Sequence, residues 1–227
     1  MNHHLHFIEA ARDNALDLLV FPELSLTGYT TSPDAEQILR WNDAHLRSWR
    51  PAAKNRACTL LWGCLCVSAK CCLSDKFCLR LPEIGLCTAK KHLYGPEKAI
   101  YAPGAFHNVL SVSGVQIGLA ICADFDEAAH AREAVQAGAE LYIASALIST
   151  GGYDVSCEQL RDRAVEQGFP VLLANWVGAV NGWQCAGGSA LWSQSGELVV
   201  RAPMDKECLV ACQVQAGAAF GQLVPVE

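Results

Sequence analysis

The sequence predicts an α/β fold that contains parallel strands. Two short apolar runs, Val115–Ile121 and Leu141–Ala144, have the length and the β-branched content of buried strands. The segment between them carries apolar residues at helical spacing on one side and charged residues on the other. A strand, a helix and a second strand in this order are typical of a βαβ unit, whose two strands run parallel.

Cys122 directly follows the first of these strands, on the turn that leads into the predicted helix. Ligands of α/β sheets bind at the carboxyl ends of the strands, and a helix N-terminus lowers the pKa of a nearby thiol. Cys122 is therefore a candidate nucleophile. A free cysteine after a strand is more often a small buried apolar residue, so this position alone does not decide between the two interpretations.

Size and composition fit one globular domain over residues 1–227. Apolar residues make up 52% of the chain and charged residues 18%, which allows a sizeable core and argues against disorder. The formal net charge of −6 argues against nucleic acid as the main partner, and no apolar run is long enough to span a membrane. The N-terminal residues do not read as a signal peptide, so we predict a cytoplasmic protein.

The chain has 12 cysteines, and six of them gather between Cys58 and Cys78. Because no export signal is apparent, we expect reduced thiols in place of a disulfide framework. The cluster contains CxC and CC but no CxxC pair, so cysteines at strand positions are a simpler interpretation than a metal or redox site. We therefore predict no bound metal.

The N-terminal part predicts a helix followed by a core strand. Residues His6–Leu19 have helical periodicity, and Leu18–Phe21 read as a short buried strand that Pro22 ends. Glu23 stands just past this strand, in the same kind of position as Cys122. A solvated loop is the commoner place for a glutamate, so Glu23 too is ambiguous by itself.

The middle part predicts a helix and then a group of strands. Asp34–Ala57 reads as helical, Cys58–Val67 as a strand with a possible bulge at Gly63, and Asp75–Leu81 with Gly85–Ala89 as a hairpin. A loop rich in glycine and proline follows the hairpin. The charged residues on this loop are Lys90, Lys91, His92 and Glu97, and for each of them alone a solvated loop is the simplest interpretation.

The C-terminal part alternates predicted strands and loops around one helix. His107–Val112 forms a hairpin with the strand before Cys122, Ser145–Tyr153 is a loop, and Cys157–Gly168 is a helix that ends at its glycine. Gly182–Gly188 reads as a loop without a phosphate-binding motif. The remaining predicted strands are Val171–Ala174, Ser189–Trp192, Leu198–Arg201 and Cys208–Val214.

Three segments thus place one reactive group each at a strand end: Glu23, Lys90 and Cys122. The order and spacing of these segments match those of a known family. The chain resembles the nitrilase superfamily of carbon–nitrogen hydrolases over nearly its whole length. The matching segments are LVFPELSLTGY at 19–29, KKHL at 90–93 with Glu97 and Pro103-Gly104, IGLAICAD at 117–124, Ala174-Asn175 and SALW at 189–192.

The resemblance implies a four-layer αββα sandwich, a homodimer or higher homo-oligomer, and a small-molecule amide substrate. It also implies a Glu–Lys–Cys triad in which Glu23 is the general base, Lys90 the lysine and Cys122 the nucleophile, with Lys91 as the neighbouring alternative to Lys90. Glu97 corresponds to the second glutamate near the triad. The candidate oxyanion and substrate-binding residues are Ala123, Asp126, Asn175 and Trp176. No metal or organic cofactor is implied.

Asp126 departs from the family's pattern. It stands four residues after the cysteine, where many relatives have an arginine that can pair with a substrate carboxylate, and no Phe-Pro-Glu follows it. An acid at this point favours a neutral or amine-bearing substrate. The alternative is that Asp126 only caps the following helix.

The start of the chain is the second departure. Family members usually begin with a strand before the first helix, whereas here the predicted helix comes almost at once. A missing strand would leave a sheet edge exposed. The leading hypothesis is a hydrolase of non-peptide C–N bonds, in a small amide or a carbamoyl-amide, that acts through a cysteine thioester; the sequence does not separate these from a nitrilase. The alternative is a non-catalytic or truncated homologue that serves as a dimeric scaffold.

Overall fold

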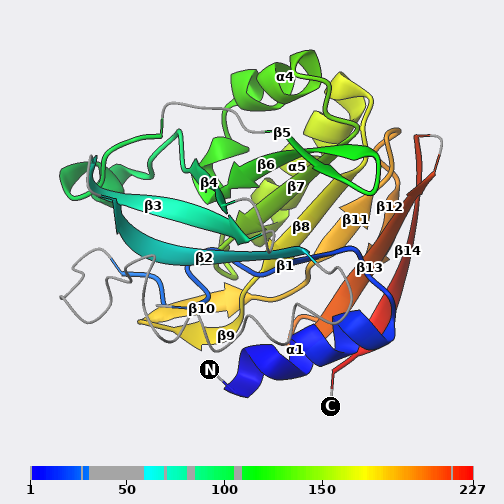
Figure 1. Ribbon diagram of the computed structural model, residues 1–227, viewed down its shortest axis with the longest axis horizontal. Coiled ribbons are helices and arrows are strands. Elements are labelled where there is room, and N and C mark those ends of the chain that lie inside the picture. The colour runs from blue at the N-terminus through cyan, green and yellow to red at the C-terminus, as the bar shows by residue number, and fades with distance from the viewer. Residues whose placement is uncertain are drawn as a thin grey trace.

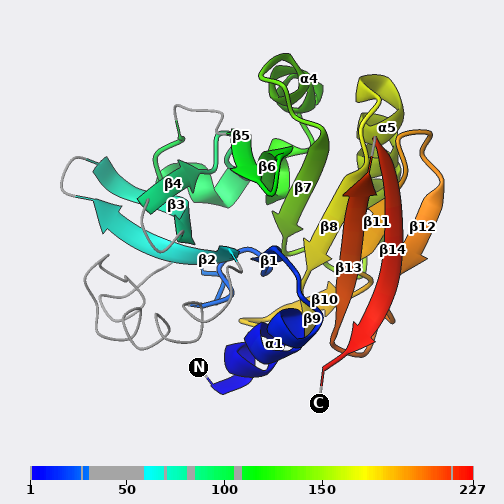
Figure 2. The same cartoon turned by 45° about the vertical axis from the view of Figure 1, so that its right-hand side comes forward.

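The computed structural model describes residues 2–26, 28–30, 59–68, 71–80, 85–104, 109–215 and 217–226. Two larger sheets lie face to face, with helices outside them (Figures 1 and 2). The four-stranded sheet has the order β1-β2-β3-β4, in which the strands are β1 Leu18–Val20, β2 Thr59–Ser68, β3 Cys71–Arg80 and β4 Gly85–Ala89.

The six-stranded sheet has the order β12-β11-β8-β7-β6-β5. Its strands are β5 Val109–Val112, β6 Val115–Ile121, β7 Leu141–Ala146, β8 Val171–Asn175, β11 Ala190–Trp192 and β12 Leu198–Arg201. Strand β7 pairs in parallel with β6 on one side and with β8 on the other, and all six of its residues are buried. Helix α4, Ala128–Gln136, connects β6 to β7, which confirms the predicted βαβ unit.

Three apolar clusters hold the layers together. The first joins α4 and α5 (Tyr153–Gln167) to one face of the six-stranded sheet, through residues such as Leu160 and Tyr142. The second fills the space between the two sheets, where Leu18 and Val20 contact residues of β5, β6 and β7. The third packs α1, Asn2–Asp13, against Leu19 and Phe21.

The alternation along β1 explains this arrangement. Successive side chains of a strand point to opposite faces, so β1 presents Leu18 and Val20 to the other sheet and Leu19 to α1. The layers are therefore helix, sheet, sheet and helix, as expected for the αββα sandwich.

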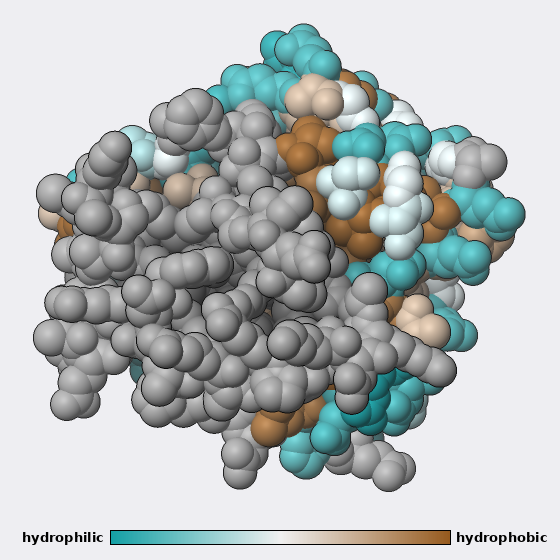
Figure 3. Space-filling model, in the orientation of Figure 1, coloured by the Kyte–Doolittle hydropathy of each residue, from teal (hydrophilic) through white to brown (hydrophobic). Residues whose placement is uncertain are grey.

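A cavity of about 820 Å³ lies between β1 and β13 (Cys208–Gln215). Among the strands that the structure describes, β1 pairs only with β2, and β13 pairs only with β14 (Ala218–Pro225). The first described element is α1, with no strand before it in the part of the chain described. The sheet edge expected from the sequence is thus present at β1. Figure 3 shows a group of apolar side chains at the surface, in the area that the six-stranded sheet occupies in Figure 1.

Several element boundaries differ from those predicted. Helix α1 ends at Asp13, not Leu19, because Ala15 adopts a positive φ of 54° and turns the chain toward β1. Helix α5 begins at Tyr153, four residues earlier than expected, and ends as predicted with Gly168 in the left-handed conformation. The bulge expected at Gly63 is wrong, since Gly63 pairs regularly with Phe77 and the register shifts between Cys66 and Ser68.

The segment predicted as the loop Gly182–Gly188 contains a strand. Residues Trp183–Ala186 form β10, which pairs with β9, Val177–Val180, in a hairpin whose turn is Asn181-Gly182. Both turn residues have positive φ, as a tight hairpin requires. Strand β14 was not predicted either. The predicted helix Asp34–Ala57 lies outside the described residues.

Candidate active site

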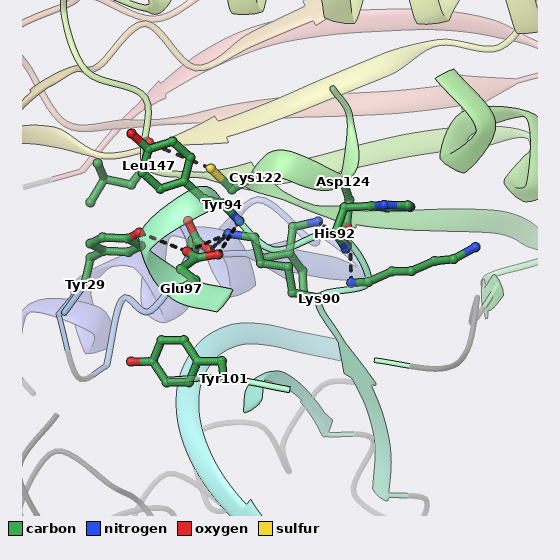
Figure 4. Close-up of polar contacts among 12 residues, drawn as sticks. Tyr29, Lys90, His92, Tyr94, Glu97, Tyr101, Cys122, Asp124 and Leu147 are labelled. Carbon is green, nitrogen blue, oxygen red and sulfur yellow. Dashed lines mark hydrogen bonds and ion pairs between the residues drawn. The ribbon is translucent and has the colours of Figure 1, made fainter. Parts of the chain in front are cut away.

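Three strand ends meet at one place between the two sheets. Glu23 follows β1, Lys90 follows β4 and Cys122 follows β6. Since β1 is parallel to β2 and each further pair in that sheet is antiparallel, β4 runs in the same direction as β1, and Glu23 and Lys90 emerge at the same edge. Figure 4 shows Lys90, Glu97 and Cys122 together with Tyr29 around this point.

Lys90 lies between two carboxylates. Its Nζ donates to Glu23 Oε1 and to Glu97 Oε1, each at 2.8 Å. The side chains of Glu23, Lys90 and Glu97 are 1%, 0% and 0% exposed, so the cluster is screened from water. Ion pairs with no access to solvent are held rigidly, because breaking one would leave an uncompensated buried charge.

Glu97 is fixed by further donors. Its Oε1 accepts the Tyr29 hydroxyl at 2.9 Å, and its Oε2 accepts the N–H of Tyr94 at 2.8 Å. Glu97 lies on the 3-10 turn η1, Gly95–Ala99, seven residues after Lys90. The Glu97 carboxylate is therefore held in a fixed position opposite Lys90.

Burial sets the protonation behaviour of the site. It raises the pKa of Glu23, while the positive charge of Lys90 lowers it and the negative charge of Glu97 raises it again. Burial also raises the pKa of the Cys122 thiol well above its usual value, and the charge of Glu23 adds to that increase. Glu23 and Cys122 are thus close enough for each to affect the pKa of the other.

The helix proposed to activate Cys122 lies further along the chain. Cys122 begins a short 3-10 turn, η2 Cys122–Asp124, whereas α4 begins only at Ala128. Cys122 therefore does not lie at the N-terminus of α4, and burial raises the pKa of its thiol. Cys122 itself has φ of 44°, which is strained for a residue with a side chain and is typical of functional turns.

The segment that carries Glu23 is held from the six-stranded sheet. Ser145 Oγ on β7 donates to the carbonyl of Phe21 at 2.7 Å, and Trp176 Nε1 donates to the carbonyl of Glu23 at 2.6 Å. Trp176, predicted as a substrate-binding residue, therefore anchors the backbone of Glu23. Whether it also contacts a substrate stays a prediction.

Asn175 and Asp126 differ in their surroundings. The Asn175 side chain is buried and accepts from the N–H of Ile148 at 2.8 Å while donating to the carbonyl of Gly187 at 2.8 Å, so it joins two loops. Asp126 is exposed, and the alternative that its side chain caps α4 is wrong, because Glu127 is the N-cap residue and makes no side-chain cap bond. The charge of Lys90 acts on Asp126, which places this carboxylate within the field of the site.

Sequence reasoning did not single out Tyr29 or Asp124. Both lie inside the motif segments, but nothing in the local pattern shows that Tyr29 reaches Glu97, 68 residues away, or that Asp124 reaches Lys91, 33 residues away. Ala123 is buried next to Cys122, and its role as an oxyanion donor stays a prediction. The lysine that faces the carboxylates is Lys90, and Lys91 instead pairs with Glu133 on α4.

Residues 1–220 match the Carbon-nitrogen hydrolase family. The chain belongs to this family. It is a carbon–nitrogen hydrolase of the nitrilase superfamily, since the match covers nearly the whole chain and amidases are among its relatives.

An (R)-stereoselective amidase from a Pseudomonas species is 28% identical over 196 residues, which are 84% of this chain and 70% of that protein. A glutamine-dependent NAD(+) synthetase from Xanthomonas campestris is 29% identical over 188 residues, or 77% of this chain but only 33% of the synthetase.

The fold is similar to that of an amidase from Nesterenkonia sp. AN1. One mutant of that amidase matches with a TM-score of 0.78 and 27% identity over 89% of this chain and 80% of that chain, and it carries the acetamide moiety of fluoroacetamide covalently at the active-site cysteine. Other mutants of the same enzyme are in complex with acrylamide and with butyramide.

Two further observations concern the described residues alone. None of the helices seen in them has the length and apolar character needed to cross a membrane. Within the same residues, no group of three or more histidine, cysteine, aspartate or glutamate side chains is placed to hold a metal ion. The side chains of the cluster Cys58–Cys78 lie outside that description.

Proposed function

We propose that this protein hydrolyses the C–N bond of small amides through a thioester at Cys122, with Glu23, Lys90 and Glu97 as its partners. The observation that supports this most is the buried cluster in which Lys90 pairs with both glutamates beside the thiol. An amide carbonyl is a poor electrophile, and a thiolate nucleophile divides its hydrolysis into two easier steps.

Glu23 serves as the general base in this proposal. The cluster holds two carboxylates and one ammonium, and moving the thiol proton to Glu23 leaves its net charge unchanged. Burial that raises both pKa values therefore does not oppose the transfer, whereas it opposes loss of the proton to water. The thiolate then attacks the amide carbon, and Glu23 returns the proton to the nitrogen as the C–N bond breaks.

Lys90 and the backbone of Ala123 stabilise the negative charge on the substrate oxygen. The ammonium of Lys90 is already fixed by Glu23 and Glu97, so it needs no reorganisation as the charge develops. In the second step Glu23 takes a proton from water and the hydroxide adds to the thioester carbon. The C–S bond then breaks to release the acid, and Glu23 returns the proton to the Cys122 sulfur.

The substrate class follows from Asp126 and from the relatives. An exposed acid in the field of the site favours a neutral or amine-bearing acyl group over one that carries a carboxylate near this point. Acrylamide and butyramide, which a related amidase binds, are neutral and small. Preferential hydrolysis of an N-carbamoyl amino acid over plain amides would contradict this part of the proposal.

The test is ammonia release from a panel of plain amides, ureido compounds, nitriles and glutamine. Glutamine belongs to the panel because curated relatives include glutamine-dependent synthetases. Cys122→Ala should abolish the release. Cys157→Ala, which removes a partly buried thiol on α5, should retain it.

A folded protein that releases ammonia from no compound would favour the dimeric scaffold. Loss of activity in both cysteine variants would show that the assay does not report on Cys122. The homodimer stays a prediction from the resemblance, and sedimentation velocity of the purified chain checks it.

A further inference from the structure

Asp124 is a buried carboxylate that has no role in the chemistry proposed above. Its side chain is 2% exposed, and the residue lies on the turn that begins at Cys122. Oδ1 accepts the backbone N–H groups of Lys91 at 2.9 Å and of His92 at 2.7 Å. Oδ2 accepts the N–H of Ile121 at 3.0 Å. Figure 4 shows Asp124 next to His92 and the segment that carries Lys90.

These three donors belong to two different sheets. Lys91 and His92 directly follow Lys90, at the end of β4 in the four-stranded sheet. Ile121 is the last residue of β6 in the six-stranded sheet and directly precedes Cys122. One carboxylate therefore ties the backbone next to the lysine to the backbone next to the thiol.

The Asp124 side chain also lies close to a histidine on α4. His130 on α4 places Nε2 at 3.7 Å from Oδ2, and its Nδ1 lies at 2.7 Å from the hydroxyl of Tyr142 on β7. The rings of His92 and His130 meet edge to face with their centroids 5.9 Å apart. The carboxylate thus has little freedom to follow either strand end if that end moves.

We infer that Asp124 is a positioning residue that fixes the distance and orientation between Lys90 and Cys122 by bonding to both strand ends. This inference rests on the proposed function for its kinetic consequence, but not for its geometry. Burial of a carboxylate is unfavourable, and these three hydrogen bonds offset part of that cost at the junction of the two sheets. A misplacement of about 1 Å between reacting groups can lower a rate by about 10²-fold.

Asp124→Asn is the informative change. The amide oxygen can still accept from Lys91 and His92, whereas the amide nitrogen would face the N–H of Ile121, donor against donor. The substitution therefore breaks the connection to the Cys122 side and keeps the other. The matched control is Glu140→Gln, because Glu140 Oε2 accepts the N–H of Gln116 near the opposite end of the same strand β6.

Two measurements are made on the purified, folded variants. For amide hydrolysis we expect kcat to fall by roughly 10–100-fold in Asp124→Asn while KM stays within about threefold. For alkylation of Cys122 by iodoacetamide, followed on its peptide by mass spectrometry, we expect a slower reaction at pH 7 and a rate profile displaced along the pH axis. Glu23, Lys90 and Glu97 are the charged groups that act on this thiol. Glu140→Gln should match the wild type in both measurements.

An unchanged kcat and an unchanged alkylation profile in folded Asp124→Asn would overturn the inference. A lower melting temperature with unchanged kinetics below it would overturn it as well, since that result describes a structural role alone. If the wild type releases no ammonia from any amide, the proposed function fails, and the alkylation profiles still decide the role of Asp124.

Discussion

At the scale of single residues, the site contains buried charged side chains and a strained backbone, and both are unfavourable for folding. Glu23, Lys90 and Glu97 are removed from water, and Cys122 has a strained backbone. Lys90 pairs with both carboxylates, so the stability of the site depends on all three charged groups being present. Substitutions should therefore have effects that differ sharply between neighbouring positions.

Lys90→Met is expected to lower the free energy of unfolding by about 3–5 kcal/mol, because it leaves two carboxylates buried without their cation. The control is Lys91→Met. Lys91 pairs with Glu133, and the two side chains are 29% and 43% exposed, so its loss should lower that free energy by no more than about 1 kcal/mol. Urea unfolding of both variants measures this, and equal effects would contradict the assigned network.

Asp124 should also make stability depend on pH. Burial raises its pKa from 3.8 to about 7, against the lowering effect of its backbone donors. A raised pKa means that the folded state binds the proton more tightly, so the wild type loses stability relative to Asp124→Asn as the pH rises from about 4 to about 7. The change should be on the order of 2–5 kcal/mol. Urea unfolding of the wild type and of Asp124→Asn at several pH values tests this, and a stability difference that does not change with pH would contradict it.

At the scale of elements, α4 lies close to the sheet at Gly118. A Cβ at this position of β6 would lie 2.9 Å from the Cβ of Ala134 and 3.2 Å from that of Ala139. The backbone of β6 thus approaches the helix that follows Cys122 more closely than a side chain permits. The packing of α4 and the position of the cysteine turn are therefore linked.

Gly118→Ala should lower the free energy of unfolding by about 1–3 kcal/mol, as overpacking of a core does. Gly151→Ala is the matched control, since a Cβ at Gly151 has no heavy atom within 4 Å. Thermal unfolding of the two variants compares them. A Gly118→Ala protein as stable as Gly151→Ala would show that α4 moves away without loss.

At the scale of the whole molecule, the strands differ in how completely their edges are paired. Strand β7 is bonded on both sides, whereas β1 and β13 each have one neighbouring strand among those described and line the cavity between them. Backbone amides that have no hydrogen-bonded strand partner are protected from hydrogen exchange only by burial. The molecule should accordingly be least protected along this cavity.

Hydrogen exchange followed residue by residue should show this difference. In β13, every second amide points toward β14 and should exchange slowly, while the alternate amides that face the cavity should exchange faster. In β7, all amides should be slow, because β6 and β8 take both sides. Uniform protection along β13 would mean that another group pairs with its open edge.

The sequence by itself determined the order of strands and turns around the site. The βαβ unit and the strand ends before Glu23, Lys90 and Cys122 follow from apolar runs bounded by turn residues, which are local signals. The β9–β10 hairpin was missed because its strands are short and half-exposed, so their pattern resembles that of a loop.

Only the tertiary structure decided what surrounds each reactive group. The sequence shows a helix after Cys122 but not the burial that raises the pKa of its thiol. Likewise, Tyr29 reaches Glu97 because the segments after β1 and β4 emerge at the same edge of one sheet, and Asp124 reaches Lys91 because the two sheets meet face to face. Burial and hydrogen bonding at a site depend on contacts between residues distant in the chain, and local periodicity carries no information about them.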